Sequence, residues 1–327
     1  MHRYFVSISI LCVFFLSSCQ KEDTSSLEGE IINEDVIKWR EEQNRWIYSS
    51  MKRNYLWADQ LKDSSKYDYS LEPESFFKSM LVSQDRFSYL EPYDGYVPRT
   101  KGALNASVSL DTMYIVGNRR VGYVVYDSFD KESDISDVAL RMAERRIDEL
   151  VVDLRRNGGG YLNTCNYLAS LILPLKFKGE LFYTSEYNKY IADENFKKTG
   201  SRTTSAYFRT DFLITNLNFG LRRVFFLTTS RSASASELLI NSLRPYMQVV
   251  SIGETSRGKD VGMIGISGQH YKYQLWPITF RTYNADNVPV PVTGLLPDIP
   301  VENTSPALLG NIGEPLLSAA IDYILNN

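Results

Sequence analysis

The feature that most constrains the fold is a repeated alternation of short apolar runs with loops of small residues and helical patterns. Apolar runs cover residues 121–126, 150–152 and 224–227, and each is followed by a stretch whose apolar residues have helical spacing. Another apolar run covers residues 249–252. Strands that alternate with helices argue for a largely parallel sheet covered by helices. The sequence therefore predicts an α/β core.

The start of the chain has the pattern of an export signal. A cationic beginning is followed by an apolar run at residues 5–16, which is too short to span a bilayer as a mature helix. Leu-Ser-Ser-Cys at residues 16–19 resembles the bacterial lipobox, in which the cysteine carries the lipid. We expect a signal peptide at residues 1–18 and a membrane anchor on Cys19. The protein would then lie in a bacterial cell envelope, on the outer membrane, facing the periplasm or the surface. A plain secretory signal is the alternative.

Three further segments are expected after the signal. Residues 19–33 are polar, which predicts a tether. Residues 34–98 are predicted to form a small helical unit, and residues 107–327 the core domain. The helical unit has an apolar stripe that we expect to be core and not a cofactor site. Its members are Trp39, Trp46, Ile47, Met51 and Tyr55.

Charge and residue counts exclude several classes of function. The formal net charge is −3 with no basic stripe, which argues against a nucleic-acid partner. After removal of the signal and lipidation of Cys19, Cys165 is the remaining thiol and His270 the remaining imidazole. An internal disulfide or a His/Cys zinc cluster is therefore not expected, nor is any cofactor. His270 lies in the strand-like stretch 269–275, so nucleophilic chemistry should use another base.

Loops at the carboxyl ends of parallel strands are where α/β proteins gather their sites, and three such loops have unusual composition. The first is Asp-Leu-Arg-Arg-Asn-Gly-Gly-Gly at residues 153–160. Its glycines suit an oxyanion hole built from backbone N–H groups, or simply a tight turn from strand to helix. It lacks the Lys-Ser/Thr ending of a phosphate loop.

The second loop is Ser-Ala-Ser-Ala-Ser-Glu at residues 232–237, which opens a helix after a buried strand. Ser234 and Glu237 have the spacing of a helix capping box. A nucleophilic serine at a helix N-terminus would have the same pattern, so both interpretations stay open at this point.

The third loop, residues 253–259, reads Gly-Glu-Thr-Ser-Arg-Gly-Lys. Most lysines are solvated surface residues. For Lys259 to act as a base, burial or a nearby cation must lower its pKa by about 2–3 units. Arg257 is one candidate for that cation.

Together the three loops resemble the C-terminal processing, or tail-specific, serine peptidases, over about residues 120–305. The resemblance implies a crotonase/ClpP-like core with Ser234 as nucleophile and Lys259 as general base. It implies oxyanion donors at the backbone N–H groups of Ala235 and Gly159. Glu237 and Gly160 are expected to support this site.

The sequence departs from that family at three points. Many members have a glutamine four residues after the lysine, where Met263 stands, so Glu237 or a carbonyl would have to orient Lys259. An aromatic residue usually stands where Arg257 is. The PDZ domain that reads substrate tails in the family is missing, because 31 residues between Tyr89 and Val121 are too few for a domain.

The resemblance predicts a serine endopeptidase that cleaves exported or unfolded polypeptides, with an adaptor as one way to replace the PDZ function. The alternative is a family member that has lost catalysis and acts as a lipoprotein binding peptides or apolar ligands, since a fold alone does not fix function.

Overall fold

The computed structural model describes residues 34–93, 107–268, 270–304 and 308–327. The predictions for the signal peptide, Cys19 and the tether lie outside these ranges. Of the helices in the described ranges, none combines the length and hydropathy needed to cross a bilayer.

The core is a six-stranded sheet with the order β12-β8-β7-β4-β3-β2. Every neighbouring pair is parallel except β2 with β3, which is antiparallel. The strands are β2 (Val108–Val116), β3 (Arg119–Tyr126), β4 (Glu149–Asp153), β7 (Arg223–Thr228), β8 (Gln248–Gly253) and β12 (Ile299–Pro300). The predicted α/β class is confirmed.

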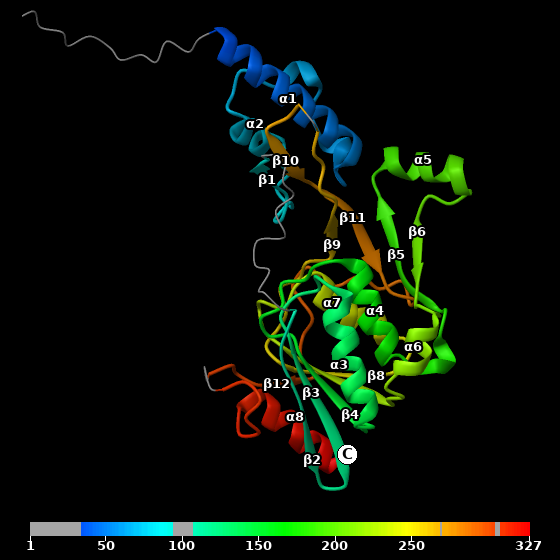
Figure 1. Ribbon diagram of the computed structural model, residues 1–327. Coiled ribbons are helices and arrows are strands. Elements are labelled where there is room, and N and C mark those ends of the chain that lie inside the picture. Colours follow the sequence, from blue (N-terminus) through cyan, green and yellow to red (C-terminus); the bar gives the residue numbers. More distant parts are fainter. Residues whose placement is uncertain (1–33, 94–106, 269, 305–307) are drawn as a thin grey trace, which may run out of the picture.

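The continuous apolar runs are explained by burial on both faces of this sheet. Every residue of β4 and β7 is buried. One face packs into a cluster with α3 (Glu132–Glu144), α4 (Leu162–Ile172), α6 (Phe212–Leu217) and α7 (Ala235–Leu243). The other face packs against α8 (Pro315–Asn326), so the core has three layers (Figure 1). Central parallel strands covered on both faces read as unbroken apolar runs.

A second, four-stranded sheet with the order β6-β5-β11-β9 rises beside this core (Figure 1). Its strands are β5 (Leu181–Tyr187), β6 (Thr204–Tyr207), β9 (Val261–Met263) and β11 (Ile278–Tyr283), and α5 (Lys189–Thr199) connects β5 to β6. The sequence patterns did not predict this sheet, because β5 mixes buried and partly exposed positions without clean alternation.

The N-terminal unit is helical, as its apolar spacing predicts. It contains α1 (Glu34–Asn54) and α2 (Pro73–Met80), with Pro73 in the first turn, and its β1 (Tyr89–Pro92) pairs with β10 (Tyr273–Trp276). Short 3-10 helices lie at η1 (Ala58–Gln60), η2 (Ser64–Lys66) and, in the core, η3 (Leu175–Phe177).

Two local predictions in this part need correction. The apolar stripe is buried at Ile47 and Met51 in α1 and at Tyr55 directly after it, but Trp39, near the start of the helix, is 36% exposed. The stretch 269–275 becomes a strand only from Tyr273, and His270 is exposed in a turn.

A buried ion cluster joins the end of β4 to the start of α8. The Arg155 guanidinium donates two hydrogen bonds of 2.7 Å to Glu314, the residue that caps α8, and its Nε donates to Asp153 at 3.0 Å. The Arg155 and Glu314 side chains are 5% and 0% exposed. A bidentate pair of this kind fixes the loop after β4 against the C-terminal helix.

Glu314→Gln should lower the free energy of unfolding by about 3 kcal/mol, because the buried Arg155 guanidinium loses its bidentate partner and keeps Asp153 as its one charged neighbour in the cluster. The measurement is denaturant unfolding of the two proteins. Glu194→Gln breaks the exposed pair with Arg53 (side chains 43% and 64% exposed) and should cost at most about 1 kcal/mol. Equal losses in the two variants would contradict this account.

Candidate active site

The three unusual loops lie side by side because the strands that carry them are neighbours. β4, β7 and β8 are consecutive in the parallel sheet, so the loops after their carboxyl ends emerge at one edge. We call these the glycine loop (residues 154–161), the serine loop (residues 229–234) and the lysine loop (residues 254–260). A site at this edge follows from the topology.

Ser234 has a backbone conformation that an ordinary helix cap does not need. It is the N-cap of α7, with φ 58° and ψ −114°. Capping residues are typically in the β region, where φ is negative. A non-glycine residue at positive φ costs about 1–3 kcal/mol, and such residues cluster at active sites. The conformation resembles the strained turn that exposes a serine nucleophile between a strand and a helix.

The glycine loop presses against this serine. A Cβ atom on Gly159 would lie 2.8 Å from the Ser234 Cβ and 3.1 Å from the Ala235 nitrogen, and Gly159 has φ +109°. The Asn157 carbonyl accepts from the Ala233 N–H at 3.1 Å and from the Ser236 hydroxyl at 3.0 Å. Only glycine permits this approach, so the glycine loop is both a tight turn and one wall of the site.

The backbone N–H groups near Ser234 differ in whether they already donate a hydrogen bond within the protein. The Gly159 N–H donates to the Asn157 Oδ1 at 2.8 Å, so it would have to share or release that bond to reach an oxyanion. The Ala235 N–H is in the first turn of α7, where helix N–H groups have no partner within the helix. The partial positive charge of a helix N-terminus favours an anion there. The roles of Ala235 and Gly159 as oxyanion donors, and of Gly160 as a supporting residue, stay predictions.

Glu237 joins the serine and lysine loops. Its side chain is fully buried, and its carboxylate accepts the Ser234 N–H at 2.9 Å, which is one half of the predicted capping box. The same carboxylate accepts the Ser256 hydroxyl at 2.5 Å, the Gly258 N–H at 2.6 Å and the Lys259 N–H at 2.9 Å. Four donors satisfy a buried carboxylate and fix the two loops relative to each other.

Lys259 has the lowered pKa that a general base requires. Burial lowers the pKa of its ammonium to about 8, and the negative Glu237 acts in the opposite direction. The cation suggested by the sequence, Arg257, is exposed and is not the cause. A lysine with a pKa near 8 is substantially neutral at slightly alkaline pH.

Much of this environment comes from a segment whose role the sequence did not reveal. The Lys259 Nζ lies 5.4 Å from the centre of the Phe87 ring. The Asp85 carboxylate accepts from the N–H groups of Phe87 and Ser88 at 3.0 and 2.9 Å, which shapes the turn that presents the ring. Arg86 donates to the Gly258 carbonyl at 2.5 Å. The signal available was Asp-Arg-Phe-Ser-Tyr at residues 85–89, which loosely resembles the same peptidase family, but nothing local connects this stretch to a lysine so far along the chain.

Met263 does not orient Lys259. It lies in β9 and packs against an apolar cluster shared with the N-terminal unit. Glu237, the suggested replacement, holds the backbone of Lys259 and not its ammonium group. Within the described residues the Nζ makes no hydrogen bond, and none joins it to the Ser234 hydroxyl. Catalytic hydrogen bonds often tighten only when substrate binds.

A cleft of about 480 Å³ opens beside these loops. Its lining includes Gly158, Ala233 and Lys259. Gly158 and Ala233 directly precede Gly159 and Ser234, which are in close contact, so the cleft extends to that contact and to the lysine. Among the described residues, no group of three His, Cys, Asp or Glu side chains could hold a metal ion.

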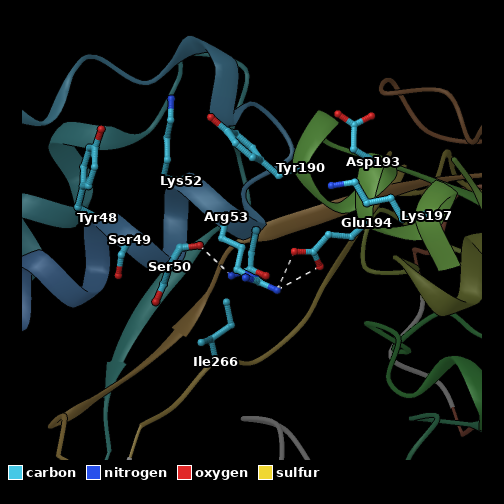
Figure 2. A pocket seen from close by; sticks show the side chains of 11 residues that line it. Tyr48, Ser49, Ser50, Lys52, Arg53, Tyr190, Asp193, Glu194, Lys197 and Ile266 are labelled. Atoms are coloured by element: carbon cyan, nitrogen blue, oxygen red, sulfur yellow. Dashed lines mark hydrogen bonds and ion pairs between the residues drawn. The ribbon is translucent and has the colours of Figure 1, made fainter.

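A second pocket, of about 940 Å³, lies between α1 and α5 and shares no residue with that cleft (Figure 2). The ion pair of Arg53 with Glu194, 3.1 Å long, crosses it and ties the two helices together. The hydroxyl of Ser49 donates to the Trp46 carbonyl of its own helix at 2.9 Å. These contacts join and order the helices, so the candidate active site is the cleft at the carboxyl ends of the core strands and not this pocket.

Comparison with known proteins covers both the core and the N-terminal unit. Residues 120–301 match the sequence model of peptidase family S41, which is more than half of the chain. This protein belongs to peptidase family S41. Residues 42–89 match the model of the peptidase S41 N-terminal domain, which covers most of the helical unit. The S41 membership confirms the resemblance seen in the three loops, and no PDZ domain is matched. No curated protein matches this chain.

Solved structures show that the S41 fold extends over nearly the whole described chain. A candidate S41 protease from Bacteroides fragilis aligns with a TM-score of 0.74 at 20% identity, covering 86% of this chain and 97% of that one. A lipoprotein from Streptococcus agalactiae aligns at 0.55 and 13% identity, with 80% and 92% covered. A candidate peptidase from Parabacteroides merdae aligns at 0.51 and 18% identity, with 88% and 97% covered.

The backbone strain at Ser234 gives a stability test. Ser234→Gly should be more stable than Ser234→Ala by about 1 kcal/mol, because glycine adopts positive φ without strain, although its flexible unfolded chain offsets part of the gain. Denaturant unfolding measures both variants. At Ser236, inside the first turn of α7, the order should reverse, with alanine more stable than glycine. If Ser234→Ala is as stable as Ser234→Gly, position 234 is not strained.

The lowered pKa of Lys259 predicts a pH-dependent stability. Lys259→Met should raise the free energy of unfolding by about 3 kcal/mol at pH 7, since the ammonium is protonated in both states there and pays for burial only when folded. The gain should shrink as pH rises from about 8 to 10.5, where the folded and then the unfolded lysine becomes neutral.

Unfolding of the wild type and Lys259→Met across this pH range measures the effect. Lys197→Met, at an exposed position of α5, is the matched control and should leave the wild-type pH dependence unchanged. A constant difference between wild type and Lys259→Met from pH 7 to 10.5 would contradict the lowered pKa.

Proposed function

We propose that this S41 family member is an active serine endopeptidase that uses Ser234 as nucleophile and Lys259 as general base. The observation that carries the proposal is the buried Glu237 carboxylate, which accepts backbone N–H groups from Ser234 and Lys259 at 2.9 Å each. The strained φ of Ser234 and the lowered pKa of Lys259 support it independently. A protein that only binds ligands needs neither feature.

In the proposed reaction, the neutral Lys259 amine takes the hydroxyl proton as the Ser234 Oγ bonds to the carbonyl carbon of the substrate. The carbonyl oxygen becomes an oxyanion, held by the Ala235 N–H and by an N–H of the glycine loop, for which Gly159 is the candidate. The C–N bond then breaks, and the Lys259 ammonium returns its proton to the leaving amine. Lys259 next takes a proton from a water whose oxygen bonds to the acyl carbon. The bond from that carbon to the Ser234 Oγ then breaks, Lys259 returns the proton to the Oγ, and the acid is released.

The proposed substrates are unfolded or exported polypeptides that can enter the cleft in extended form. The described residues place the cleft at an open edge of the core sheet, and its lining includes Phe87 from the N-terminal unit. An adaptor in place of a PDZ domain, and an envelope location through a lipid on Cys19, are parts of the proposal that rest on the sequence alone.

Activity should rise with pH and level off above about pH 8, because only the neutral form of Lys259 accepts the proton. Ser234→Ala and Lys259→Ala should each lower kcat by about 10⁴-fold or more. The measurement is cleavage of an unfolded model protein by the chain beginning at residue 20.

Ser201→Ala, an exposed serine between α5 and β6, is the matched control and should keep full activity. Thermal unfolding of each variant shows that it is folded. A wild type that is inert at every pH would favour the ligand-binding alternative, and a Lys259→Ala variant with full activity would remove lysine from the mechanism.

A further inference from the structure

The cleft beside Ser234 is lined by cationic side chains. Half of its lining residues carry a basic group and none carries an acid; the lining is Phe87, Arg156, Gly158, Ser230, Arg231, Ala233, Arg257 and Lys259. The whole chain has a formal net charge of −3, so this concentration of positive charge does not reflect the composition of the protein. A cleft lined by one sign of charge attracts ligands of the opposite sign.

Two of the three arginines are not neutralised. The Nε of Arg156 donates to Asp127 at 3.1 Å, which satisfies part of that guanidinium. Arg231 and Arg257 are exposed, and neither side chain forms an ion pair or hydrogen bond with any residue that the structure describes. Free guanidinium groups are the side chains best suited to a two-point contact with a carboxylate.

The backbones that carry these two arginines are held next to each other. The Arg257 N–H donates to the Ser232 carbonyl at 2.9 Å, and the Arg231 N–H donates to the Thr229 hydroxyl at 3.2 Å. This brings the lysine loop against the serine loop one residue from Arg231. The pair is therefore a fixed feature of the site and not an accident of two flexible loops.

The position of the cleft relative to Ser234 determines what it can contact. Ala233 and Gly158, which line it, are the direct chain neighbours of Ser234 and Gly159. A polypeptide whose carbonyl lies at the Ser234 Oγ would place one of its nearest side chains, or its chain end, in the cleft. The group bound there belongs to a residue close to the bond that is cut.

We propose that Arg231 and Arg257 form a subsite that binds a carboxylate of the polypeptide substrate within about two residues of the scissile bond. The inference rests on the proposed function. The carboxylate can be an aspartate or glutamate side chain or the C-terminal carboxylate, and both present the same chemistry to a guanidinium. Pairing of the two arginines with this carboxylate contributes to substrate selection. It gives Arg257 a binding role that the aromatic residue usual at this position in the family would not have.

The test compares matched quenched peptides with glutamate or glutamine at each of the two positions on either side of the bond cut in an unfolded protein. A second pair carries a free C-terminal carboxylate or a C-terminal amide. One glutamate peptide, or the free-acid peptide, should have a kcat/KM about tenfold or more above its neutral partner. The preference should appear mainly in KM and weaken with added salt. Which pair shows it identifies the source of the carboxylate.

The double variant Arg231→Gln/Arg257→Gln should cleave charged and neutral peptides equally. The control is Arg222→Gln, which makes the same substitution at one exposed arginine, just before the opposite end of β7. It should keep the full preference. A wild type that cleaves all pairs equally, or a preference that survives in the double variant, would overturn the subsite.

Binding separates this inference from the proposed function. Fluorescence anisotropy of the same labelled peptides on Ser234→Ala measures carboxylate selection without catalysis. Tighter binding of the charged peptide, lost in the triple variant with both arginines changed, supports the subsite even if the wild type cleaves nothing. Equal binding of charged and neutral peptides would overturn it, whatever the activity.

Discussion

The site depends on one buried carboxylate. Glu237 is fully buried in the first turn of α7, and its oxygens accept four hydrogen bonds from the serine and lysine loops. An unsatisfied carboxylate at this depth would be strongly destabilising, so the two loops can fold around it only in the arrangement that supplies all four donors. The carboxylate that accepts the Ser234 N–H at the start of the helix also accepts the Lys259 N–H, so it holds the backbones of both residues close to each other. The capping and catalytic interpretations of the serine motif are therefore compatible.

Two features at the carboxyl ends of the core strands lower the stability of the fold, and interactions elsewhere in the molecule offset this loss. Ser234 holds a positive φ, and Lys259 is partly buried with a lowered pKa. Residues that serve catalysis commonly carry such costs. Against them stand a sheet buried on both faces and the ion cluster of Arg155 with Asp153 and Glu314. That cluster fixes the start of the glycine loop, where Arg155 is the second residue after β4.

The N-terminal unit is part of the site and not an accessory to it. Its turn at Asp85 presents Phe87 to the Lys259 ammonium, and Arg86 donates to the Gly258 carbonyl. The strand β1 pairs with β10, which joins the unit to the second sheet. Burial of Lys259, and with it the lowered pKa, therefore requires contacts between segments that are far apart in the chain.

The sequence by itself determined the strand and helix alternation of the core, the three loops and the family to which they belong. These could be predicted because each is written in consecutive residues: the apolar runs of β4 and β7 reflect burial on both faces, and the loops keep short motifs. The sequence did not predict the sheet built from β5, β6, β9 and β11, the exposure of Trp39 or the role of Phe87. For the lowered pKa of Lys259 the sequence left burial and a nearby cation such as Arg257 both open, and burial is the cause. Strand order, side-chain burial and the conformation of Ser234 come from pairings between distant segments, and only the tertiary structure decides those.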